Sequence, residues 1–250
     1  MHDPIVDPWV ALRGFTPARI GLGRTGDAPP LGAVLDFQLA HARARDAVHA
    51  QLDIGALLGK LAEPHVLVQS RAVDRGTFLR RPDLGRRLAP DCAARLQRGE
   101  WDAVFVLADG LSASALRNHG LPVLQGARAA LPGWRIAPVV IATQARVALG
   151  DEIGEALGAS LCAVLIGERP GLSVADSLGV YLTHAPRIGR RDSERNCISN
   201  IHSSGGLPPA LAAEKLAWLM REALRLRITG VELKDDQPES VPAASKVIEG

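Results

Sequence analysis

The feature that most constrains this chain is a recurrence of short apolar runs beyond residue 100. The runs lie at 103–108, 139–142 and 161–166, and stretches of helical composition follow the first two of them. Apolar runs of this length that alternate with helices are typical of parallel strands covered by helices on both faces. The pattern therefore predicts an α/β fold.

Weaker signals add further elements to this sheet. Residues 65–69 read as an earlier strand, 178–182 as a later strand and 228–233 as a last edge strand, whereas 209–226 read as a late helix. No internal repeat is visible.

The first hundred residues have a different character. Prolines recur through residues 1–30 and prevent a continuous helix, which predicts an extended arm. Residues 31–61 favour one long helix or two short ones, and 83–98 favour another. We therefore divide the chain into an arm at 1–30, a helical N-terminal domain at 31–98, an α/β domain at 99–234 and a polar, mobile tail at 235–250.

Composition excludes several classes of partner. The 29 basic and 27 acidic residues are mixed along the chain and give a net charge of +2, so no long-range positive field would attract nucleic acid or anionic lipid. No apolar run approaches the ~20 residues that a membrane span needs. Cys92, Cys162 and Cys197 are far apart and form no C-x-x-C pair, which predicts reduced thiols. We expect a cytoplasmic protein.

A glycine-rich segment, Gly21–Gly26, matches the G-x-G-x-x-G pattern of dinucleotide-binding folds. That pattern requires a strand before it and a helix that opens at its last glycine. Here Pro17 precedes the segment closely, and Pro29 and Pro30 follow it. We therefore interpret it as a surface turn.

The sequence contains none of the common catalytic motifs: G-x-S-x-G, H-E-x-x-H and the Walker sequence are all absent. Its seven histidines show no helical metal-ligand spacing with a carboxylate, so we expect no metal site. The D-x-H-x-x-G loop, through which one class of cobalamin enzymes supplies a histidine to cobalt, is also absent.

Polar residues gather after the expected strands, where open α/β sheets bind ligands. Glu168 and Arg169 follow the run 161–166, and the segment 187–201 is rich in charged, amide and hydroxyl groups. Two interpretations stay open for each: a surface ion pair or solvated loop, or a set of groups that fixes a large polar ligand.

Segments spread along the chain resemble the ethanolamine ammonia-lyase small-subunit family. They are, in order, 15–24 (FTPARIGLGR), 35–49 (LDFQLAHARARDAVH), 81–87 (RPDLGRR), 108–113 (ADGLSA), 146–154 (RVALGDEIG), 167–172 (GERPGL) and 197–201 (CISNI). The resemblance covers nearly the whole chain and is specific because the order and spacing of the segments also match.

The resemblance implies a helical N-terminal domain and a Rossmann-like, mostly parallel, three-layer C-terminal domain. It also implies a subunit that helps to bind adenosylcobalamin at the interface with a large TIM-barrel subunit. The barrel would hold ethanolamine and the catalytic groups, so this chain would have no catalytic residues of its own and no activity alone. The reaction would be the radical conversion of ethanolamine to acetaldehyde and ammonia within a higher hetero-oligomer.

Transferred by position, the cobalamin contacts of the family fall on Val147, Glu168 and Cys197. The corrin rim carries neutral amides whose N–H groups need acceptors, and Glu168 would supply a charge-assisted one. Val147 and Cys197 would act through main-chain groups and packing. Because neighbouring residues of an extended segment point to opposite faces, we do not expect Arg195 to activate the Cys197 thiol.

Two other functions remain alternatives at this stage: a stand-alone nucleotide-binding or regulatory protein, and an assembly subunit that leaves the cofactor untouched. Fold alone does not decide between them. Some relatives carry a longer N-terminal extension that is linked to packaging, whereas this chain reaches its first family segment after about a dozen residues. A bacterial microcompartment is therefore the less favoured alternative to the cytoplasm.

Overall fold

A computed structural model describes residues 7–237 of the chain. Its helices and strands run in the order α1 (Trp9–Arg13), α2 (Leu31–His49), α3 (Ile54–Leu58), β1 (His65–Gln69), α4 (Arg75–Arg80), β2 (Trp101–Ala108), α5 (Ala113–Ala115), α6 (Leu121–Ala129), β3 (Val139–Thr143), α7 (Leu149–Leu157), β4 (Ala159–Gly167), β5 (Leu178–His184), β6 (Arg195–Ile201) and α8 (Pro209–Leu226). Short helical turns complete the chain: η1 (Leu84–Arg86), η2 (Pro90–Arg95), η3 (Leu116–Gly120), η4 (Asp192–Glu194) and η5 (Gly230–Glu232). Within these described residues, no helix has the length and apolar character needed to cross a membrane.

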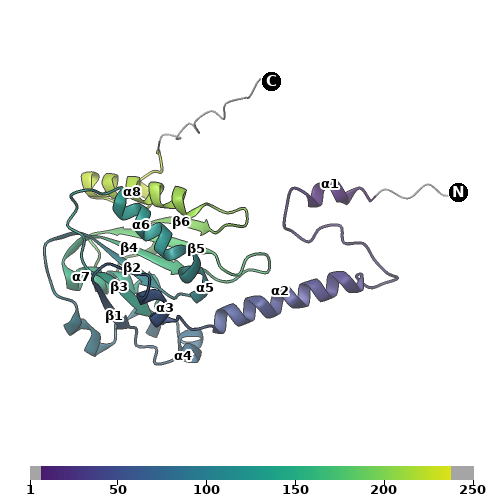
Figure 1. Cartoon of the computed structure of the whole chain (residues 1–250), viewed down its shortest axis with the longest axis horizontal. Helices are drawn as coiled ribbons and strands as arrows, with labels where there is room; N and C mark the ends of the chain where they lie inside the picture. The colour runs from purple at the N-terminus through teal and green to yellow at the C-terminus, as the bar shows by residue number, and fades with distance from the viewer. Residues whose placement is uncertain (1–6, 238–250) are drawn as a thin grey trace, which may run out of the picture.

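The six strands form one sheet in the order β1-β3-β2-β4-β5-β6. The pairings β1/β3, β3/β2 and β2/β4 are parallel, and β4/β5 and β5/β6 are antiparallel. The helices α6 and α8 cover one face, and α7 covers the other (Figure 1). The predicted α/β fold with a mostly parallel, three-layer sheet is confirmed.

The central strand β4 explains why an unbroken apolar run can be a strand. Leu161, Ala163 and Leu165 belong to the core on the α6 and α8 side. Their neighbours Cys162 and Val164 belong to the core on the α7 side. Side chains alternate between faces along a strand, so a strand with helices on both faces needs apolar residues at every position.

Helix α2 projects from the sheet body (Figure 1). Its C-terminal end is anchored, because Arg75 Nε donates to the Val48 carbonyl at 2.8 Å and Ala44 is buried. The chain before α2 turns back along it, so that Arg19 lies 5.9 Å from the centre of the Phe37 ring. The predicted arm contains one short helix, α1, and the Gly21–Gly26 segment follows no strand and opens no helix. Its interpretation as a turn is confirmed.

Two predicted elements are wrong. Residues 83–98 form the separate turns η1 and η2, because Ala89 N–H donates to the Gln69 carbonyl at 2.9 Å and Pro90 then holds its predecessor in an extended conformation. Residues 228–233 form η5 instead of an edge strand. The Asn196 side chain holds this turn, since its Oδ1 accepts from Gly230 N–H at 2.8 Å.

The other predicted strands are confirmed. β1 and β5 lie where the sequence placed them, and residues 31–61 form two helices, α2 and α3. Because β1 pairs with β3, the predicted N-terminal domain contributes a strand to the sheet. The domain boundaries stay a prediction, and the predicted tail at 235–250 lies outside the described residues apart from 235–237.

A buried ion pair joins α7 to the edge strand β6. Arg195 Nη1 and Nη2 donate to the two carboxylate oxygens of Asp151 at 2.6 and 2.7 Å. Arg195 also donates to Thr183 Oγ1 at 2.9 Å. Because both charged side chains are almost fully buried, removing one partner leaves a buried charge unpaired.

We predict that Asp151→Ala lowers the free energy of unfolding by about 3–5 kcal/mol, the range for breaking a buried pair. Urea unfolding of the chain measures this change. The control is Glu222→Ala, which removes the exposed pair between Glu222 and Arg225 and should change stability by less than about 1 kcal/mol. Equal effects of the two variants would contradict the prediction.

Candidate functional site

The site lies at the carboxyl ends of the parallel strands. The chain after β2 enters α5 and α6 on one face of the sheet, whereas the chain after β3 enters α7 on the other face. These strands are neighbours. The loops that follow them therefore separate and leave a crevice, which is where open α/β sheets bind ligands.

Asp109, directly after β2, holds the loop that follows β3. Its carboxylate accepts from Gln144 N–H at 2.9 Å and from Ala145 N–H at 3.1 Å, and it pairs with Arg75 at 3.5 Å. Burial raises the pKa of Asp109, although these hydrogen bonds and Arg75 oppose the shift. Gln144 has a φ of +54°, which is unfavourable for a non-glycine residue. Asp109 thus stabilises the strained loop that leads to Val147.

Val147 lies at the start of the turn into α7. Its carbonyl accepts from Gly150 N–H at 3.0 Å. Its side chain packs, half-buried, against the core on the α7 side of the sheet, as does that of Tyr181. The main chain at Val147 is therefore fixed by the helix that it begins.

Glu168 follows β4 and uses one of its two carboxylate oxygens within the protein. Oε2 accepts from Ser177 Oγ at 2.5 Å and from Asn200 N–H at 3.2 Å. Across residues 7–237, Oε1 has no hydrogen-bond partner. Glu168 lines a cleft of about 820 Å³ that also includes His202 and the arm residues 14–17. One oxygen is thus held while the other is available to a ligand.

Cys197 is exposed on β6, opposite Tyr181 of β5. Partial burial is the main cause that raises the pKa of its thiol, and the charge of Glu168 adds to the shift, whereas Tyr181 acts in the opposite direction. Arg195 and Cys197 lie two residues apart on β6 and therefore share a face of the strand, so the predicted placement of Arg195 on the opposite face is wrong. Arg195 is nevertheless unavailable to the thiol, since its charge is paired with Asp151.

Tyr181 is a further residue near the predicted positions. It packs in the same core as Val147 and lies opposite Cys197. Burial raises its pKa, with further contributions from Cys197 and Glu168. The sequence analysis missed Tyr181, although it is the chain's one tyrosine and lies in an apolar strand. The cleft beside Glu168 is lined by neither Val147 nor Cys197, so the three positions do not share this cavity.

The site has little acid–base chemistry of its own. The thiol of Cys197 and the phenol of Tyr181 both have a raised pKa and are therefore neutral near pH 7. His202 lines the cleft, but its Nε2 lies 2.8 Å from Asn200 Oδ1 and its Nδ1 accepts from Ser204 N–H at 3.2 Å. No group of three or more His, Cys, Asp or Glu side chains in the described part of the chain could hold a metal ion.

We predict that iodoacetamide alkylates Cys197 more slowly in the native chain than in the urea-unfolded chain at pH 8, because the native thiol has the higher pKa. The native rate should rise steeply toward pH 10. Peptide mass spectrometry measures each cysteine separately. The buried Cys92 and Cys162 should stay unreactive in the native chain and react in the unfolded chain, which controls for unfolding. Equal rates in the native and unfolded chains at pH 8 would contradict the raised pKa.

Comparison with known proteins gives one consistent result. Residues 6–234 match the family model described as ethanolamine ammonia-lyase light chain (EutC). Ethanolamine ammonia-lyase small subunits from Azotobacter vinelandii and Pseudomonas putida are 53% and 52% identical over 241 residues, which cover 92% of this chain and 89% and 88% of those proteins. The protein of that name from Xanthomonas campestris is 51% identical over 244 residues, or 93% of this chain and 89% of its own length. The chain therefore belongs to the ethanolamine ammonia-lyase light-chain family.

Proposed function

We propose that this chain is the small subunit of an adenosylcobalamin-dependent ethanolamine ammonia-lyase, which converts ethanolamine to acetaldehyde and ammonia. The observation that carries the proposal is identity above 50% over about nine-tenths of both chains with proteins named as that small subunit. The large TIM-barrel subunit would contribute the substrate site and the catalytic groups. This chain would form one side of the cofactor-binding site, at its interface with the large subunit. The hetero-oligomer would lie in the cytoplasm, with a microcompartment as the alternative location.

The described residues fit a corrin. Its rim amides need hydrogen-bond acceptors, and Glu168 Oε1 is available for one of them. Gln144 Oε1 is buried without a partner and offers a second. When bound, the cofactor supplies the radical chemistry that begins with cleavage of its cobalt–carbon bond, and the protein supplies orientation and exclusion of water.

We assign Val147, Glu168 and Cys197 to contacts with this cofactor. Val147 and Cys197 would act through main-chain groups and shape, since one is apolar and the other carries a neutral thiol. Both nitrogens of His202 are engaged, so this residue of the cleft is not free to bind cobalt. The absent D-x-H-x-x-G loop and the family resemblance favour a cofactor that keeps its own dimethylbenzimidazole on the metal.

Exposed apolar side chains support a large partner. They lie on the arm and on the projecting helix α2 (Figure 1), and they are Trp9, Val10, Leu12, Phe15, Leu31, Leu35, Phe37 and Leu39. Phe15 is 89% exposed and Leu31 is 72% exposed. Large apolar side chains exposed in this number on two neighbouring segments favour an interaction site.

We predict that the isolated chain has no deaminase activity and that activity requires both the large subunit and adenosylcobalamin. The reason is that the described site offers no activated nucleophile or acid–base pair. Coupled reduction of acetaldehyde measures turnover for each component alone and for the mixture. Ethanolamine turnover by the chain free of large subunit would contradict the proposal.

We predict that Glu168→Gln weakens cobalamin binding to the complex by about ten- to a hundredfold, because a charge-assisted hydrogen bond is worth ~1.5–3 kcal/mol. Folding should change little, since the glutamine oxygen can still accept from Asn200. Spectroscopic titration with cobalamin measures affinity, and Glu214→Gln on the exposed side of α8 is the control. An unchanged titration would remove Glu168 from the site and favour a subunit that only assists assembly.

We predict that Cys197→Ser retains most activity, whereas Cys197→Trp blocks cofactor binding by filling the space beside Tyr181. The serine side chain is close in size to that of cysteine and leaves the main chain unchanged. Because the pKa of the thiol is raised, little of the reactive thiolate is present near neutral pH. Turnover and cobalamin titration are measured on both reconstituted complexes. A hundredfold fall in turnover for the serine variant, with unchanged cofactor binding, would show that the thiol itself participates.

A further inference from the structure

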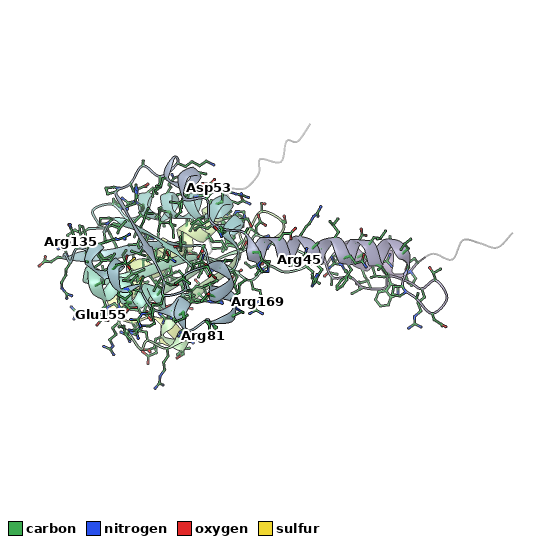
Figure 2. The ribbon with its side chains drawn as sticks, turned by 90° about the horizontal axis from the view of Figure 1, so that it is seen from below. Arg45, Asp53, Arg81, Arg135, Glu155 and Arg169 are labelled. Carbon is green, nitrogen blue, oxygen red and sulfur yellow. The ribbon has the colours of Figure 1, made fainter. Side chains whose placement is uncertain are left out.

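Besides the cleft at Glu168, a second recess at the carboxyl edge of the sheet is lined by positively charged side chains. We call this recess the basic crevice. It has a volume of about 440 Å³ between α2 and the loops that follow β2, β3 and β4. Its lining includes His41, Arg45 and His49 of α2, Leu111 after β2, Arg146 after β3 and Arg169 after β4. Figure 2 shows Arg45 where α2 meets the body of the molecule, with Arg169 on the adjoining edge.

The arginines of the basic crevice have little compensating charge. No aspartate or glutamate lines it. Arg45 makes one exposed contact with Asp46 at 3.7 Å, and Arg169 makes no ion pair with any residue in the range 7–237. Their charges therefore remain available to an anion.

Arg146 is the most constrained of these cations. Its guanidinium lies 4.3 Å from the centre of the Phe78 ring, and Nη2 donates to the Phe78 carbonyl at 3.4 Å. Its Nε is buried without a hydrogen-bond partner, as is Nη2 of the neighbouring Arg75. Burial lowers the pKa of Arg146, and the positive charges of Arg75 and Arg169 lower it further. Arg146 and Arg75 therefore each keep one buried guanidinium nitrogen without an acceptor, which an oxyanion could satisfy.

We infer that the basic crevice binds a phosphate group, namely the phosphodiester in the nucleotide loop of the cobalamin. The inference rests on the proposed function. Guanidinium groups donate in a planar fork that matches phosphate oxygens. Arg146 immediately precedes Val147, and Arg169 immediately follows Glu168, so the crevice adjoins two of the proposed corrin contacts. One cofactor can therefore span both sites.

The test compares two corrinoids on the complex of this chain with its large subunit. Cyanocobalamin carries the phosphodiester, whereas dicyanocobinamide lacks the whole nucleotide loop. The variant is Arg45→Gln/Arg169→Gln, because both side chains are exposed and their loss should not disturb folding. Arg117→Gln/Arg187→Gln removes the same charge from exposed positions outside the crevice and is the control.

We expect the crevice variant to bind cyanocobalamin about tenfold more weakly, with dicyanocobinamide affinity unchanged. Inorganic phosphate should compete with cyanocobalamin but not with dicyanocobinamide. The same loss for both corrinoids, or no loss for either, overturns the inference. Calorimetry also measures whether the chain binds inorganic phosphate. If it does, and the variant leaves the affinity for cyanocobalamin unchanged, the crevice is a site for free phosphate and the assignment to the cofactor is overturned. Failure of the unmodified complex to bind either corrinoid would instead contradict the proposed function.

Discussion

The carboxylate of Asp109 is the interaction on which the site depends most. Asp109 directly follows β2, and its carboxylate accepts hydrogen bonds from two backbone N–H groups of the loop after β3. The same carboxylate forms an ion pair with Arg75 at the start of α4. Arg75 in turn donates to the Val48 carbonyl at the end of α2. One buried charge therefore ties two strands and two helices together at the carboxyl edge. Its cost of burial is offset by hydrogen bonds that no apolar residue could replace.

This arrangement places two kinds of group at the carboxyl edge of the sheet and a third farther along β5 and β6. Glu168 provides a carboxylate oxygen without a hydrogen-bond partner in the described residues, and the basic crevice presents arginines with little compensating negative charge. Tyr181 and Cys197 form a neutral patch on β5 and β6. A cobalamin combines neutral amide donors, a large rim and one phosphodiester, so under the proposed function each of these groups would meet the matching chemistry. The proposed function assigns the reaction chemistry to the large subunit and cofactor binding to this chain.

The sequence predicted the helices and strands that are determined by residues close to one another in the chain. The run at 161–166 is apolar at every position because helices cover both faces of β4, and a reader of sequence can recognise that pattern. Residues 83–98 and 228–233 were misassigned because contacts from distant segments, at Gln69 and Asn196, determine their conformation. The assignment of Val147, Glu168 and Cys197 to cofactor contacts came from the resemblance and stays a proposal. Tyr181 and the basic crevice depend on strand order and register, so the sequence alone could not reveal them.

Hydrogen–deuterium exchange on the complex of this chain with its large subunit, with and without cyanocobalamin, tests the central claim most directly. If the cofactor lies against this chain, backbone amides in 144–148, 168–177 and 195–201 should exchange more slowly when it is bound. Segments away from the carboxyl edge, such as the middle of α8, should not change. Protection confined to the large subunit, with these three segments unchanged, would contradict the account.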